Sequence, residues 1–145
     1  MPEIKRVDLI FRKLANTKSY LRELEELRPK SLQEHLSNLE KKRAIERQIQ
    51  LVVESVIDAG EIIVIELFKQ PPKNRKEVII KLKEFNVISR ELTEAMIPAI
   101  SLRNRIVHKY DIIKDELVFA AIPKVATAVR DLIRALSKFI AASSK

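Results

Sequence analysis

The chain has 145 residues, a formal net charge of +8, one glycine and no cysteine, and 46% of its residues are hydrophobic. A domain of this size can bury a core, and the lack of cysteine excludes disulfides, thiolate nucleophiles and cysteine-bound zinc. Because a sheet protein with many turns needs more glycine and aromatic residues, the composition predicts one all-α domain over residues 1–145.

The first half of the chain predicts two long helical segments separated by a proline. Apolar residues at three- and four-residue steps indicate a helix over residues 4–27. It ends before Pro29, because the residue preceding a proline is disfavoured in helical geometry. Ser31 then begins a second segment, and Glu34 three residues later completes a capping-box pattern. We expect this segment to reach Phe68.

A break in the second segment is expected near residues 37–38, and the helix after it is the most apolar of the chain. Its apolar side chains have the helical period of a helix that is buried in a bundle. Gly60, the single glycine, destabilises this helix by about 1 kcal/mol relative to alanine. We therefore expect another helix backbone to approach closely at Gly60.

A proline-containing linker at residues 70–73 precedes a short amphipathic helix, expected over residues 75–85. Asn74 is placed to cap that helix, since an asparagine side chain accepts from the first free backbone N–H groups. Residues 69–90 hold seven lysines or arginines against two glutamates, which makes this stretch the most basic surface outside the motif described below.

The last two predicted helices each contain a proline. One is expected over residues 89–110 and should be kinked or divided at Pro98. The other is expected over residues 115–142 and should bend at Pro123. Together the elements predict a four- to five-helix, mainly antiparallel bundle.

The charge and hydropathy of the chain bear on its partners and its compartment. A net charge of +8 suits a polyanion such as nucleic acid, although solubility or heat adaptation also produces basic, lysine-rich chains. The longest strongly apolar run, Ile62 to Ile65, is far too short to cross a membrane. The first residues open an amphipathic segment rather than a signal peptide, so we expect a cytoplasmic protein with no membrane partner.

A motif at residues 102–110 places Arg103, Asn104, His108 and Tyr110 within about two helical turns. Asn104 and His108 are four residues apart and share a helix face. Arg103 and His108 are offset by about 140° on a straight helix, which presents them awkwardly to one substrate. Arginine is long enough to reach round the helix, or a homodimer would bring a second copy of the pair to the same site; the offset favours a two-fold dimer.

The residue types of the motif suit RNA cleavage without a metal or cofactor. An imidazole can take or return a proton during attack of the ribose 2′-hydroxyl on the neighbouring phosphate. A guanidinium can stabilise the charge that develops on that phosphate. We expect Arg103 and His108 to be catalytic, Asn104 to orient the histidine or the phosphate, and the product to be a 2′,3′-cyclic phosphate. With only two histidines and no cysteine, a transition-metal site is not expected.

The same motif residues also permit a purely structural interpretation. His108 could interact with the dipole at the C-terminal end of its helix, Arg103 could be a surface salt-bridge partner, and Tyr110 could wedge against the bundle. His35, the other histidine, lies near a helix start and is interpreted as structural.

Two carboxylates on the apolar second segment are further candidates for the site. Glu54 and Asp58 are four residues apart and so share a face. They either belong to a solvated face, with Arg103 or Arg47 as partners, or one of them orients Arg103 or His108 in the site.

The pattern Arg103-Asn104-x-x-x-His108-x-Tyr110 resembles the signature of the HEPN superfamily, specifically its HepT-like toxins. Residues 44–58 are similar to that family's second helix, and Pro71-Pro72 precedes the motif in the family's order. The resemblance covers roughly residues 40–140. The sequence departs from the pattern at residues 112–115, where the family usually has an acidic residue sooner after the tyrosine; Asp115 is that residue displaced.

The resemblance implies a dimerising helical bundle and a metal-independent ribonuclease, the toxin of a type VII-like toxin–antitoxin pair. It implies that a minimal nucleotidyltransferase antitoxin, of the MntA type, transfers AMP to Tyr110 and blocks the site. The RNA substrate would be a tRNA or an mRNA. An alternative is a non-catalytic HEPN module that binds a nucleotidyltransferase or a nucleotide, and a third is a general nucleic-acid-binding bundle.

Overall fold

The computed structural model describes residues 3–108 and 113–143, and in this part of the chain it contains helices and no strands. The all-α prediction is confirmed. Six helices are formed by the described residues: α1 (Val7–Leu27), α2 (Leu32–Ser37), α3 (Leu39–Phe68), α4 (Arg75–Glu84), α5 (Arg90–His108) and α6 (Asp115–Ser143).

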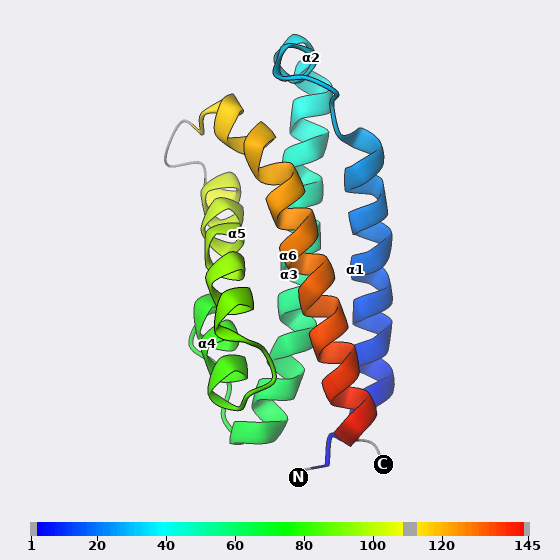
Figure 1. The fold of residues 1–145 in the computed structure, drawn as a ribbon, viewed down its shortest axis with the longest axis vertical. Coiled ribbons are helices and arrows are strands. Elements are labelled where there is room, and N and C mark those ends of the chain that lie inside the picture. Colours follow the sequence, from blue (N-terminus) through cyan, green and yellow to red (C-terminus); the bar gives the residue numbers. More distant parts are fainter. Residues whose placement is uncertain (1–2, 109–112, 144–145) are drawn as a thin grey trace.

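The four long helices form a mainly antiparallel bundle, as predicted. In Figure 1, α1 and α5 run upward while α3 and α6 run downward, and both ends of the chain lie at the lower end. The central helix is α3, which packs against each of the other five. Its inner face is apolar and fully buried, as are the facing residues of α1, α5 and α6. No helix in the described residues is both long and apolar enough to cross a membrane.

The second segment divides where the sequence indicated, and this division raises the number of helices to six. Asn38 interrupts the helix with extended backbone, and its Oδ1 accepts a hydrogen bond from the Lys41 N–H at 3.0 Å. An asparagine side chain at this position competes with the helix before it and caps the helix after it. The short α2 is therefore a separate element, packed against the start of α3 and against α6.

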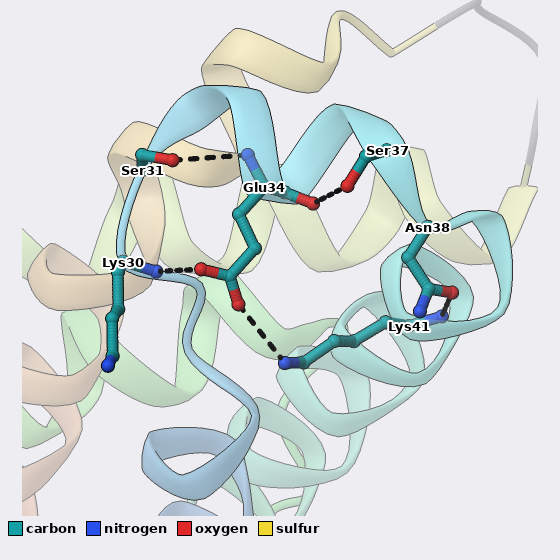
Figure 2. A network of polar contacts seen from close by, with 6 residues as sticks. All are labelled: Lys30, Ser31, Glu34, Ser37, Asn38 and Lys41. Carbon is teal, nitrogen blue, oxygen red and sulfur yellow. Dashed lines mark hydrogen bonds and ion pairs between the residues drawn. The ribbon is translucent and has the colours of Figure 1, made fainter.

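Helix α2 is held by a polar network centred on Glu34, which Figure 2 shows. The Glu34 N–H donates to Ser31 Oγ at 3.1 Å, which confirms Ser31 as the N-cap. The Glu34 carboxylate accepts from the Lys30 N–H at 3.1 Å, one residue earlier than in a standard capping box, and from Lys41 Nζ at 3.5 Å. The backbone N–H of Lys30 is the main reason that the pKa of Glu34 lies below its usual value.

Gly60 permits a close approach, but by side chains rather than by another helix backbone. A Cβ at this position would lie 3.1 Å from Leu82 Cδ1 and 3.3 Å from Val78 Cγ1, both on α4. The predicted close approach at Gly60 is confirmed, but the expected helix backbone was wrong, because the neighbours are side chains. The consequence is that α4 sits tightly on α3 through its buried face of Val78, Ile79 and Leu82.

The prolines of the last two helices do not divide them. Helix α5 continues through Pro98 and α6 through Pro123. The expected division at Pro98 is therefore not found. The yellow start of α6 does run at an angle to the rest of that helix (Figure 1), in keeping with the lost hydrogen bond of an internal proline. Residues 109 and 110 of the motif lie outside the described residues.

Candidate active site

The motif side chains line a basic groove between the end of α5 and the start of α4. The groove has a volume of about 570 Å³. Four of its lining residues come from α5 and four from the segment that begins α4: Arg103, Asn104, Val107, His108, Lys73, Asn74, Arg75 and Lys76.

Arg103 is buried, although it carries a charge. Its Nε donates to Glu54 Oε1 at 2.9 Å and its Nη2 donates to the same oxygen, so α5 and α3 are joined by an ion pair. Its Nη1 donates to Asn104 Oδ1 at 3.0 Å. Three of the five N–H donors of the guanidinium are thus committed. The interpretation of Arg103 as a surface salt-bridge partner was wrong in one respect, because the pair is not at the surface.

Glu54, on α3, fixes the arginine and is not itself one of the lining residues. Its Oε1 also accepts a hydrogen bond from Gln50 Nε2 at 3.1 Å. Partial burial by itself raises the pKa of Glu54, but hydrogen bonds from Arg103 and Gln50 and the charges of Arg103 and Arg75 outweigh it, so the net pKa is lowered. Glu54 therefore stays ionised at neutral pH and holds the guanidinium in one orientation.

His108 is the last residue of α5 and its side chain is exposed. This position is compatible with a favourable interaction with the helix dipole, so the structural interpretation of the imidazole is still open. The angular offset from Arg103 does not separate the two side chains, however. Both line the same groove of a single chain.

Asp58, the second carboxylate candidate, is not found in the groove. Asp58 lies one turn beyond Glu54 on α3 with its side chain exposed, and it is not among the lining residues. Tyr110 lies outside the described residues. Of the two carboxylates, Glu54 alone meets the motif.

Three cations in the groove were not foreseen as site residues. Lys73, Arg75 and Lys76 belong to the basic stretch noted in the sequence, but nothing in the sequence placed that stretch opposite the motif. The available signal was the linker and the Asn74 cap, which is confirmed: Asn74 Oδ1 accepts from the Glu77 N–H at 2.9 Å. That signal fixes where α4 begins, though not what it faces.

Neither histidine belongs to a metal-binding cluster in the described residues, since no three His, Asp or Glu side chains gather there in a way that could hold a metal ion. His35 is 3% exposed and stacks on Phe119 of α6, with ring centroids 5.8 Å apart. It lies in the α2 region, away from the groove lining.

Comparisons with known proteins agree on one family. The family model described as "HepT-like: Ribonuclease HepT-like" matches residues 17–138. The tRNA nuclease HepT of Aphanizomenon flos-aquae (strain 2012/KM1/D3) is 34% identical over 103 residues, covering 71% of this chain and 70% of that protein.

Two solved structures share the fold at low sequence identity. A tri-AMPylated HEPN toxin of Shewanella oneidensis, in complex with MNT antitoxin, has a TM-score of 0.83 and 18% identity, with 90% of this chain and 98% of that chain covered. The cytosolic protein YutE of Bacillus subtilis, described as of unknown function, has a TM-score of 0.80 and 15% identity, with 98% and 94% covered.

Proposed function

Because the chain belongs to the HepT-like ribonuclease family, we propose that it is a toxin that cleaves RNA without a metal ion, with Arg103 and His108 as its catalytic residues. One observation carries the proposal. A guanidinium held by Glu54 and an exposed imidazole line the same basic groove of one chain. Phosphate chemistry needs both a fixed positive charge and a group that exchanges protons.

The reaction is an internal transfer within the RNA. The ribose 2′-oxygen attacks the adjacent phosphorus, a new P–O2′ bond forms, and the P–O5′ bond breaks. The 2′-hydroxyl loses its proton to a base and the departing 5′-oxygen gains one, so the products are a 2′,3′-cyclic phosphate and a 5′-hydroxyl. His108 performs one of these two proton transfers. Water, or His108 of a second copy in a homodimer, performs the other.

Arg103 stabilises the extra negative charge of the pentavalent phosphate. Glu54 and Asn104 occupy three of its donors, which leaves two N–H groups for the phosphate. A guanidinium that is already oriented needs no rearrangement as the charge develops. Glu54 and Asn104 are thus positioning residues that act through Arg103.

The proposed partner is a minimal nucleotidyltransferase antitoxin that transfers AMP from ATP to Tyr110. The tyrosine oxygen would attack the α-phosphorus and pyrophosphate would leave. The support is the shared fold with a toxin described as AMPylated and bound to an MNT antitoxin. Since Tyr110 follows His108 by two residues, an attached AMP would bring bulk and negative charge to the edge of the groove.

The test is cleavage of RNA by the purified protein in the presence of EDTA, with a 2′,3′-cyclic phosphate detected at the new end. Substitution His108→Ala should remove cleavage, and an unchanged rate would overturn the proposal. If the wild-type protein cuts no RNA but binds a nucleotidyltransferase tightly, the chain is instead a non-catalytic HEPN module.

The AMP transfer has a separate test. After incubation with the antitoxin and ATP, the intact mass of the protein should rise by whole AMP units and cleavage should stop. Modification of the Tyr110→Phe variant under the same conditions would exclude Tyr110 as the acceptor.

A further inference from the structure

The wall of the basic groove that faces the motif is cationic, and the proposed reaction does not use it. Lys73, Arg75 and Lys76 line this wall, at the start of α4. Together with Arg103 they give the groove four permanent positive charges among the residues that the structure describes, and none of its described lining residues carries a carboxylate. Two nearby carboxylates are already engaged: Glu54 by Arg103, and Glu77 by the backbone N–H of Lys73.

The backbone at the start of α4 is held by two hydrogen bonds and by the packing of α4 on α3. The Lys73 N–H donates to Glu77 Oε1 at 3.2 Å, and the Glu77 N–H donates to Asn74 Oδ1 at 2.9 Å. These two hydrogen bonds cap the N-terminus of α4. Below it, the apolar face of α4 packs closely on Gly60 of α3. Arg75 and Lys76 are therefore presented from the capped first turn of a helix, and Lys73 from the residue that precedes the N-cap.

The three side chains differ in their surroundings. Lys73 and Lys76 are exposed and extend into solvent. Arg75 is half-buried, its Nε is shielded from solvent, and no described residue accepts a hydrogen bond from that atom. Its charge nevertheless contributes to the lowered pKa of Glu54. Arg75 is thus close enough to the Glu54–Arg103 pair for its charge to act on Glu54. Its Nε–H has no hydrogen-bond acceptor among the described residues.

We propose that Lys73, Arg75 and Lys76 bind the phosphodiester backbone of RNA beside the scissile phosphate, so that the substrate runs between the start of α4 and the end of α5. The proposal rests on the function proposed above. Cations of this kind release counterions from the RNA and strengthen binding in a salt-dependent way, without reading bases.

An RNA strand fits the groove better than an acidic protein partner does. Val107 is the single apolar side chain among the eight lining residues that the structure describes. Protein interfaces have an apolar core within a polar rim, whereas nucleic-acid interfaces are polar and strongly positive throughout. The groove has the second composition.

The experiment measures binding of a fluorescent single-stranded oligoribonucleotide of mixed sequence to the full chain carrying His108→Ala, over a range of salt concentrations. Adding Lys73→Gln and Lys76→Gln should weaken binding and lower the slope of log K against log salt by about 1.4, because each lost phosphate contact removes about 0.7 from single strands. Arg75→Gln should lower the slope further.

The matched control is Lys83→Gln with Lys138→Gln, which removes the same charge from exposed positions outside the groove, on α4 and α6. Its slope should match that of the parent. If the control and the groove variants lose equally, only net charge matters and the proposal is wrong. Equal thermal stability of the variants shows that the fold is intact.

Failure of this proposal is distinguishable from failure of the proposed function. If the protein with native His108 cleaves RNA and Lys73→Gln/Lys76→Gln leaves both kcat/KM and the salt slope unchanged, the enzyme assignment stands and the RNA path is wrong. Weakened binding of the antitoxin with unchanged RNA binding would assign the wall to a protein partner instead. If the protein never cleaves RNA but the groove variants still lower the salt slope of RNA binding, the enzyme assignment is wrong and the RNA-binding surface stands.

Discussion

The two histidines of this chain stand in opposite surroundings, and the contrast separates structure from function. His35 is buried at the junction of α2 and α6, where it stacks on Phe119. His108 is exposed at the end of α5, in a groove with a fixed guanidinium. His35 contacts its own fold and stabilises it, whereas His108 is placed where a ligand in the groove would meet it.

The same contrast holds for the charged networks around them. Next to His35, Glu34 forms hydrogen bonds with Lys30, Ser31 and Lys41, all within seven residues of it in the sequence. At the groove residue Arg103, Glu54 of α3 binds the guanidinium from 49 residues away in the sequence and, with Asn104, leaves two of its N–H groups for a substrate. The following variants test the contrast, from the largest expected effect to the smallest.

Replacement of His108 by alanine should have the largest effect on activity and almost none on stability. Loss of a proton-transfer group lowers a cleavage rate by roughly 10²- to 10⁴-fold. Because the side chain is exposed, the melting temperature should stay close to that of the wild type. Cleavage assays and thermal unfolding by circular dichroism measure the two quantities. A large fall in stability with normal cleavage would show that His108 is a structural residue and not a catalytic one.

Substitution Glu54→Gln should lower kcat roughly 10- to 100-fold while KM changes little, because a misplaced guanidinium loses transition-state contacts before it loses substrate binding. Glu54→Asp should recover part of the rate. The matched control is Asp58→Asn, which removes the same charge one turn along α3 from an exposed side chain. Steady-state kinetics distinguish the variants. An equal loss in both would mean that the charge of this face matters and the contact with Arg103 does not.

Replacement of His35 by alanine should destabilise the fold by about 2 kcal/mol, because it leaves a cavity against Phe119. The rate of RNA cleavage should be unchanged at a temperature where the variant is folded. Denaturant unfolding gives the free energy. If His35→Ala abolished cleavage in the folded protein, the α2 region would have to contact the substrate.

The dependence of stability on pH should also involve His35. Burial lowers the pKa of His35; Asp115 and Glu46 raise it and Lys42 lowers it, and the net pKa lies below the usual 6.5. The unfolded chain therefore takes up this proton more readily, so stability falls as the pH drops through and below about 6.5. The His35→Phe variant, which keeps the stacked ring, should lose less stability between about pH 7.5 and about pH 5. Parallel pH curves for the two proteins would contradict the prediction.

The smallest expected effect belongs to the cap of α2. Ser31→Ala removes the acceptor of the Glu34 N–H and should destabilise the protein by about 1 kcal/mol. Ser37→Ala is the control. The Ser37 hydroxyl, at the other end of the same helix, donates to the Glu34 carbonyl, and its loss should change the free energy of unfolding by less than about 0.5 kcal/mol. Cleavage should be normal in both variants.

The sequence predicted well whatever depends on neighbouring residues. Ser31 and Asn74 cap their helices as their spacing indicated, because a cap acts within four residues. The pattern of apolar side chains placed α3 at the centre of the bundle. At Pro98 we expected a kink or a division, and the division is not found, since the helix continues through the proline.

The geometry of the candidate site was harder to predict than its residue types. Arg103 and His108 were proposed from their spacing, but whether one chain brings them to one groove was left open, because the offset on a straight helix and the reach of a long arginine point in opposite directions. The choice between Glu54 and Asp58 depends on how α5 packs on α3. The cationic wall at Lys73–Lys76 depends in turn on α4 resting on Gly60. These contacts join helices that are far apart in the sequence, and a single sequence does not predict them.

The ion pair between Glu54 and Arg103 makes the order of folding matter for the activity of the protein. The carboxylate lies on α3 and the guanidinium on α5, so the arginine is oriented only after these two helices have docked. A nascent chain carries α3 well before α5, and until the later helix settles it has the components of the site without their arrangement. On the function proposed above, cleavage of RNA would then be a property of the finished bundle alone, and the rate at which α5 docks would set the moment at which a newly made molecule becomes active.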